Sequence, residues 1–226
     1  KEALATCPKA AKTLYTDGAK FLKYEIGKEK TDVAKRDSLI EDLFKLYDQR
    51  IEYFGQKGTV LGYKGNDAFR YKGSKEPEIA YNILKEAVAV SKAKTHPAFL
   101  DTYYRAMFET MKKELVSKTE VLEEYLVISE YMEQGLSSTT KESMKEAYEK
   151  AMANISEYFI LIATCDDIEA IASEKFAAAP DDIDNVKKMM KILVKRDCTN
   201  DDIFTKVAAK LNELEPSHES AYALTI

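Results

Sequence analysis

The sequence is poor in the residues that several protein classes require. It contains no Trp and only two histidines, His96 and His218, which excludes a histidine-rich metal site. Its 8 Gly and 5 Pro are too few for a β-protein that turns every ten residues or so. No stretch approaches roughly 18 uninterrupted apolar residues, so we expect no transmembrane segment.

The charges are present in nearly balanced numbers. The 226 residues contain 34 Lys+Arg and 39 Asp+Glu, which gives a net charge of -5. A mildly acidic chain with no long basic run is predicted to bind neither nucleic acid nor an anionic membrane surface. Hydrophobic residues at 45% and charged residues at 32% are typical of a folded globular protein.

Apolar residues recur at helical spacing through most of the chain, and no segment alternates with a period of two. We therefore predict an all-α fold, a stack of antiparallel helical hairpins that forms an α-α superhelix as one domain over residues 1–226. Five of the eight glycines lie within residues 55–73, so the helix at 59–71 is expected to be weak, and Gly135 is expected to end another. The predicted hairpins span about 8–54, 59–93, 97–135, 140–178 and 181–214.

One segment carries a degenerate repeat signature. Leu61-Gly62 match the Leu-Gly pair of a tetratricopeptide first helix, and Ala80, Leu84 and Ala87 match the spacing of its second helix. The gap between these two halves is about six residues longer than the repeat pattern gives. Small residues are needed at such positions because they let two paired helices approach closely.

Three further motifs extend this likeness over most of the chain: Cys7-Pro8-x-Ala10, the run from Tyr47 to Gly55, and Glu215-Pro216-Ser217. With them, the chain resembles the secreted tetratricopeptide-repeat proteins of Gram-negative bacterial envelopes. The resemblance implies a non-enzymatic scaffold that binds a protein or peptide partner and needs no cofactor. It also implies a periplasmic or cell-surface location after removal of a signal peptide, and association with the outer membrane through other components.

The repeat register indicates where a partner would bind. Tyr63, Asn66 and Arg70 lie three and four residues apart, so they share one face of the first helix and are expected to point toward a concave surface. The apolar ending of the chain after Pro216 predicts an eleventh helix that needs a partner, and hence a longer natural repeat protein.

The three cysteines bear on the compartment. Cys165 and Cys198 flank two predicted helices at nearly equal distances from the turn between them, which allows either a disulfide or two half-buried thiols. A disulfide would indicate an oxidising compartment. Cys7 is expected to pack near the start of the first helix, although a lipid-attachment site is the alternative.

Other residue patterns that resemble ligand-binding or catalytic motifs have simpler structural interpretations. The glycines after Phe54 lack the Gly-Lys-Ser/Thr ending of a phosphate loop. The pairs Asp166-Asp167 and Asp181-Asp182 are expected to start helices, where carboxylates are stabilised. We predict no metal site and no catalytic residues. The alternative functions are a glycan-binding helical lipoprotein of a nutrient-uptake system and an all-α enzyme.

Overall fold

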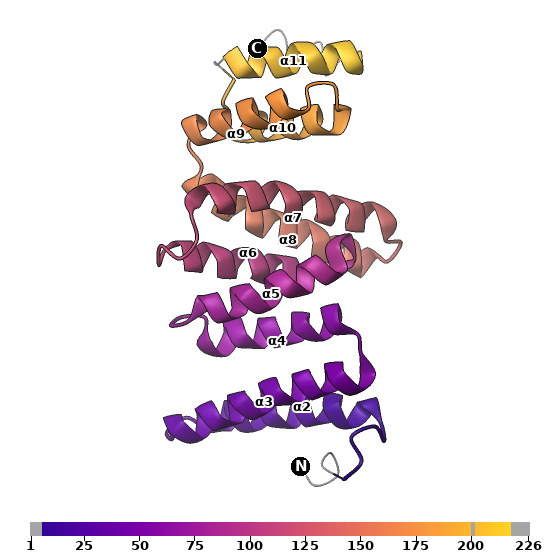
Figure 1. Ribbon diagram of the computed structural model, residues 1–226, viewed down its shortest axis with the longest axis vertical. Helices are drawn as coiled ribbons and strands as arrows, with labels where there is room; N and C mark the ends of the chain where they lie inside the picture. Colours follow the sequence, from indigo (N-terminus) through magenta and orange to yellow (C-terminus); the bar gives the residue numbers. More distant parts are fainter. Residues whose placement is uncertain (1–5, 200–201, 218–226) are drawn as a thin grey trace. The chain divides into compact units, whose positions relative to one another are not determined.

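The structure is a computed structural model that describes residues 6–199 and 202–217 (Figure 1). Within these residues the chain is helical and contains no strand, so the predicted all-α class is confirmed. His218 and most of the helix predicted after Pro216 lie outside the described residues. The helices are α2 (Lys12–Lys28), α3 (Val33–Phe54), α4 (Lys57–Lys72), α5 (Pro77–Ser91), the 3-10 helix η1 (Lys92–Lys94), α6 (Pro97–Met111), α7 (Lys118–Ser138), α8 (Glu142–Ile162), α9 (Cys165–Ala178), α10 (Ile183–Lys195) and α11 (Asp202–Leu214).

The chain forms two compact units. Unit 1 comprises Lys1–Val116 and Ile128–Met152, and unit 2 comprises Ser117–Val127 and Ala153–Ile226. Residues of α7 and α8 therefore belong to both units.

Helices in unit 1 pack against their neighbours in sequence. Helix α2 packs on α3, α3 on α4, and α4 on α5, while α6 contacts both α4 and α5 (Figure 1). Proline occupies the first position of α5 and of α6, where the missing N–H costs no hydrogen bond. Each helix thus covers the apolar face of the preceding one, which is the packing expected of stacked hairpins.

Helix α4 is where this packing is closest. A Cβ atom on Gly62 would lie 2.2 Å from the Phe99 ring, and one on Gly65 would lie 2.3 Å from Leu84 Cγ. The helix expected at 59–71 is present, and α4 is continuous over Lys57–Lys72 despite its glycines. Glycine costs helix propensity here, but it frees the space that the side chains of α5 and α6 fill.

Gly135 has the same role in α7. The prediction that it ends a helix is wrong, since α7 continues to Ser138. A Cβ atom at Gly135 would lie 2.3 Å from the ring of Tyr148, a residue of α8. Gly135 is thus a position of close helix approach rather than a helix terminus.

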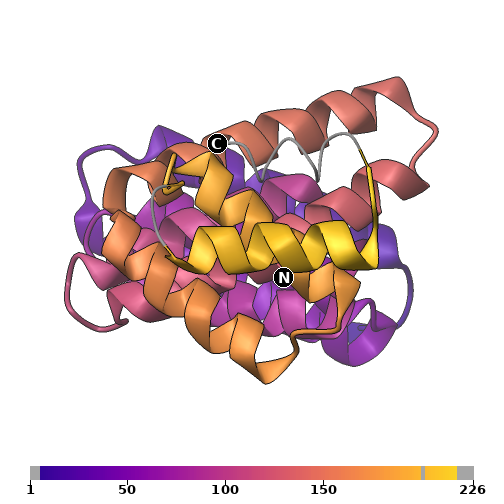
Figure 2. The ribbon, with the colours of Figure 1, turned by 90° about the horizontal axis from the view of Figure 1, so that it is seen from above.

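In unit 2, α9, α10 and α11 pack against one another (orange to yellow in Figure 2). Asp182 caps α10, because its side chain accepts hydrogen bonds from the backbone N–H groups of Asp184 and Asn185. A disulfide joins Cys165, at the first position of α9, to Cys198, just beyond α10. Cys7 is exposed and is not in a disulfide.

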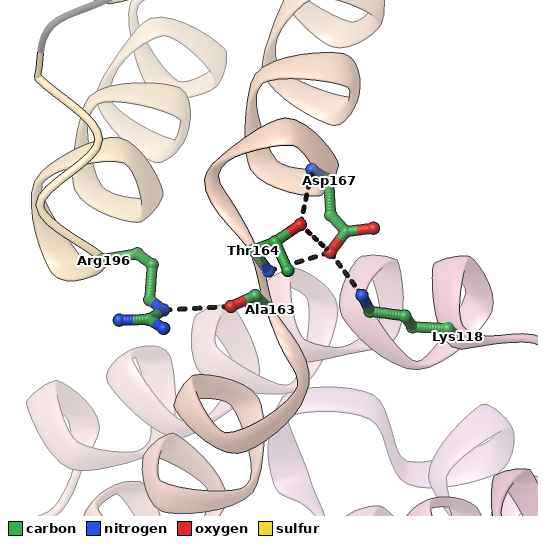
Figure 3. A network of polar contacts seen from close by, with 5 residues as sticks. All are labelled: Lys118, Ala163, Thr164, Asp167 and Arg196. Atoms are coloured by element: carbon green, nitrogen blue, oxygen red, sulfur yellow. Dashed lines mark hydrogen bonds and ion pairs between the residues drawn. The ribbon is translucent and has the colours of Figure 1, made fainter.

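Polar contacts fix the junction between α8 and α9 (Figure 3). Thr164 and Asp167 form a capping box, in which each side chain accepts from the other residue's backbone N–H. Asp167 also pairs with Lys118 at the start of α7, and Arg196 Nε donates to the Ala163 carbonyl over 2.9 Å. Desolvation raises the pKa of Asp167, but the hydrogen bonds from Lys118 and Thr164 outweigh it and leave the pKa below its ordinary value.

The close approach of α4 to α6 predicts that Gly62→Ala destabilises the protein. Overpacking against the enclosed Phe99 ring should cost about 1–3 kcal/mol, partly offset by the better helix propensity of Ala. Gly27→Ala is the matched control, because no heavy atom lies within 4 Å of a Cβ placed there. Urea unfolding should show a loss for Gly62→Ala and no loss for Gly27→Ala; equal stability of the two variants would contradict this account.

The disulfide predicts a loss of stability on its removal. Replacing Cys165 and Cys198 together with Ala opens a loop of 33 residues, for which the chain-entropy model gives about 3–4 kcal/mol. Cys7→Ala should have no such effect, because Cys7 is exposed and outside any disulfide. Thermal unfolding of both variants without reductant provides the measurement, and a double variant as stable as the parent would refute a stabilising role.

Candidate functional site

Unit 1 contains a cleft of about 450 Å³, here called the Tyr63 cleft. Its walls come from the start of α4, the α5–α6 connection, the end of α7 and the first half of α8. The lining residues are Gly58, Thr59, Tyr63, Ser91, Ala93, Lys94, Thr95, His96, Pro97, Phe99, Gly135, Ser138, Thr139, Met144 and Tyr148.

Tyr63 gives the cleft an exposed aromatic wall. It is 44% exposed, and its ring meets the buried Phe99 edge-on, with 5.3 Å between the ring centroids. The Phe99 ring occupies the space left free by the hydrogen side chain of Gly62. An exposed ring that is fixed by a buried one offers a rigid apolar contact at little entropic cost to a ligand.

The α5–α6 connection brings hydroxyl groups into the same cleft. Thr95 is 3% exposed, and its Oγ1 has no hydrogen-bond partner among the described residues. Next to it, His96 caps α6 through Nδ1, which accepts from the N–H of Ala98 over 3.2 Å. Partial desolvation lowers the pKa of His96, so its neutral form persists to lower pH than usual. Further hydroxyls come from Thr59, Ser91, Ser138 and Thr139.

A second hollow of about 300 Å³, here called the Arg50 pocket, is also lined by Tyr63. Its other lining residues belong to α2 and α3: Thr16, Ala19, Lys20, Lys23, Tyr47 and Arg50. Arg50 is only 8% exposed, and its Nη2 donates to Gln56 Oε1 over 3.3 Å. Three of the seven lining residues are therefore cationic.

A buried polar network ties α2, α3 and α4 together beside this pocket. Asp67 is 5% exposed and accepts a 2.7 Å hydrogen bond from the Tyr47 hydroxyl at Oδ2. Lys23 Nζ lies 2.6 Å from the same oxygen. Burial, followed by the charge of Asp67, raises the pKa of Tyr47 far above its ordinary value, so Tyr47 remains the donor at any working pH.

The three residues predicted to face a concave surface have different surroundings. Tyr63 lines both hollows, whereas Asn66 and Arg70 line neither. Asn66 is partly buried, and its Oδ1 is enclosed without a hydrogen-bond partner among the described residues. Arg70 is exposed, and its guanidinium carbon lies 5.7 Å from the centroid of the Tyr71 ring.

The sequence analysis did not identify Arg50 and Asp67 as site residues, although their spacing places each on the apolar face of its helix. Arg50 follows Tyr47 by three residues and precedes Phe54 by four, so it lies on the apolar stripe of α3. Asp67 similarly follows the buried Val60 by seven residues, two helical turns along the same face of α4. A charged residue on the inward face of a helix indicates a buried partner or a ligand.

The network predicts that Tyr47→Phe lowers stability. The substitution removes a hydrogen bond to a buried carboxylate, a type of bond worth about 1.5–3 kcal/mol. Tyr24→Phe is the control, because Tyr24 is 59% exposed and its hydroxyl group should not affect folding. Chemical denaturation should separate the two variants; a Tyr47→Phe protein as stable as Tyr24→Phe would show that the bond contributes nothing net.

Neither a metal site nor a membrane-spanning helix is found in the part of the chain that the structure describes. No group of three or more His, Cys, Asp or Glu side chains there is arranged to hold a metal ion, and no helix there has the length and apolarity to cross a bilayer. No known protein family, no curated protein and no solved structure matches the chain.

Proposed function

We propose that the protein is a non-enzymatic helical-repeat scaffold that binds an extended segment of a partner protein along unit 1. The observation that carries this proposal is the position of Tyr63, an exposed ring held by Phe99 that lines two separate hollows. Side chains on either side of a peptide bound across Tyr63 could enter the two hollows. Aromatic anchors of this kind supply most of the binding energy in many protein interfaces.

The chemistry of the two hollows supports a peptide. The Tyr63 cleft combines aromatic walls with hydroxyl groups, which suits an uncharged side chain and the polar atoms of its backbone. The Arg50 pocket is cationic, which suits an acidic group. A segment with an apolar residue close to an acidic one would complement both hollows at once.

We further propose a location in the bacterial cell envelope, periplasmic or at the cell surface. The resemblance of the sequence to secreted tetratricopeptide-repeat proteins supports this proposal, as does the Cys165–Cys198 disulfide. Disulfides persist in oxidising compartments and are rare in the reducing cytosol.

Glycan binding is the second candidate function, and the Tyr63 cleft is the observation that favours it. Sugars are bound by aromatic faces together with hydrogen-bonding groups, and the enclosed Thr95 hydroxyl is a group without a partner among the described residues. The lining contains Lys94 and no Asp or Glu, so a neutral sugar meets no unfavourable charge there.

The test is selection of a displayed random-peptide library against the whole chain. We expect enriched peptides that contain an apolar residue near an acidic one, and a Tyr63→Ser variant that binds them at least about tenfold more weakly, as loss of an aromatic anchor would require. Tyr24→Ser is the control, because Tyr24 is an exposed tyrosine that lines neither hollow.

The outcomes distinguish the two functions. Failure to enrich any peptide, or equal binding by both variants, would overturn the peptide proposal. Binding of neutral oligosaccharides on a carbohydrate array, weakened by Thr95→Val and Tyr63→Ser, would establish the glycan function in its place.

A further inference from the structure

The Arg50 pocket contains a buried guanidinium without a matching anion. Arg50 is 8% exposed, yet no carboxylate of the described residues lies within ion-pair distance of it. Its one hydrogen bond, to the neutral side chain of Gln56, is 3.3 Å long, and its Nε is enclosed without a partner. Removing a charged group from water is costly unless it is paired, and a guanidinium has five N–H groups to satisfy.

The charged residues around the pocket do not neutralise the Arg50 guanidinium. Lys23 is neutralised by Asp67 at 2.6 Å, and Lys20 by Asp17 at 3.0 Å on the exposed side of α2. The pocket and its surroundings therefore contain three cations but only two carboxylates. The cation without a carboxylate partner is the buried one, Arg50. The group as a whole therefore carries a net positive charge, which favours the entry of an anion.

The pocket has the shape and the donors to hold a small anion. Its volume is about 300 Å³, and the Thr16 side chain and the Tyr63 ring complete its wall. The planar fork of an arginine matches the paired oxygens of a carboxylate or a phosphate.

We propose that the Arg50 pocket is a binding site for an oxyanion, a carboxylate or a phosphate group, held chiefly by the Arg50 guanidinium. The Arg50 guanidinium donates to the oxyanion, and Lys20 and Thr16 contact it from the rim. That this oxyanion is carried by the partner segment that crosses Tyr63 rests on the proposed function. The oxyanion site itself stands on the pocket alone.

The site can be tested on the whole chain with simple ions. Inorganic phosphate and acetate are titrated separately into ¹⁵N-labelled protein at constant ionic strength, with chloride as the reference ion, while the arginine Nε–Hε resonances are followed by NMR. We expect the Arg50 resonance to move and saturate with one or both ions, whereas the resonance of the exposed Arg70 does not saturate. Saturation by phosphate alone assigns a phosphate ligand, and saturation by acetate assigns a carboxylate.

Substitutions at exposed positions test anion binding without disturbing the buried core. Lys20→Glu replaces an exposed cation at the mouth, and it should raise the dissociation constant of the ion about threefold or more. Lys12→Glu makes the same charge change at an exposed position of α2 that does not line the pocket, and it should leave the constant unchanged. Arg50→Lys should weaken binding, because an ammonium group lacks the planar fork.

The proposal is overturned if the Arg50 resonance moves linearly with every ion, as the Arg70 resonance does, or if Lys20→Glu and Lys12→Glu have equal effects. Because no peptide enters these titrations, a failed peptide selection leaves the oxyanion site standing, and a failed titration leaves peptide binding at Tyr63 standing.

Discussion

The close approach of α4 to α5 and α6 is the constraint on which unit 1 depends. At Gly62 and Gly65 there is no room for a Cβ atom, because the side chains of Phe99 and Leu84 occupy that space. The methyl side chains of Ala80 and Ala87 are fully buried on α5. Glycine at these positions gives up the burial of a larger side chain, but it allows α4 to pack closely against α5 and α6.

The same contact builds the binding surface. Phe99 can lie against α4 because residue 62 is glycine, and the Phe99 ring in turn fixes the exposed ring of Tyr63. A residue in the core thus determines the position of a residue at the surface. Tyr63, which lines both hollows, is thus held in place by a core residue of unit 1.

The buried charges of unit 1 serve two different ends. Lys23, Asp67 and Tyr47 satisfy one another, so they connect three helices without leaving a charge unpaired. Arg50 lies on the neighbouring turn of α3 from Tyr47, but it has only an amide oxygen as a partner. A paired network stabilises the fold, whereas an unpaired buried cation is a feature that a ligand can complete.

In unit 2, a disulfide and polar contacts hold the helices together, whereas close helix contacts do so in unit 1. The disulfide, the Thr164–Asp167 capping box and the Arg196–Ala163 hydrogen bond all act within a few residues of the α8–α9 junction. Asp167 and Asp182 lie at the starts of α9 and α10, the helix starts at which the sequence predicted carboxylates.

The helices could be predicted from the spacing of apolar residues, because this spacing reports directly on which face of a helix is buried. It also indicated that Gly62, Ala80 and Ala87 form a close helix contact, and that Tyr63 lies on an outward face. It led to the wrong role for Gly135, because the space around a glycine depends on Tyr148, a residue of another helix. No sequence pattern showed that Arg50 lacks a carboxylate while Asp67 has two partners, because electrostatic pairing depends on distances between helices that no local pattern encodes.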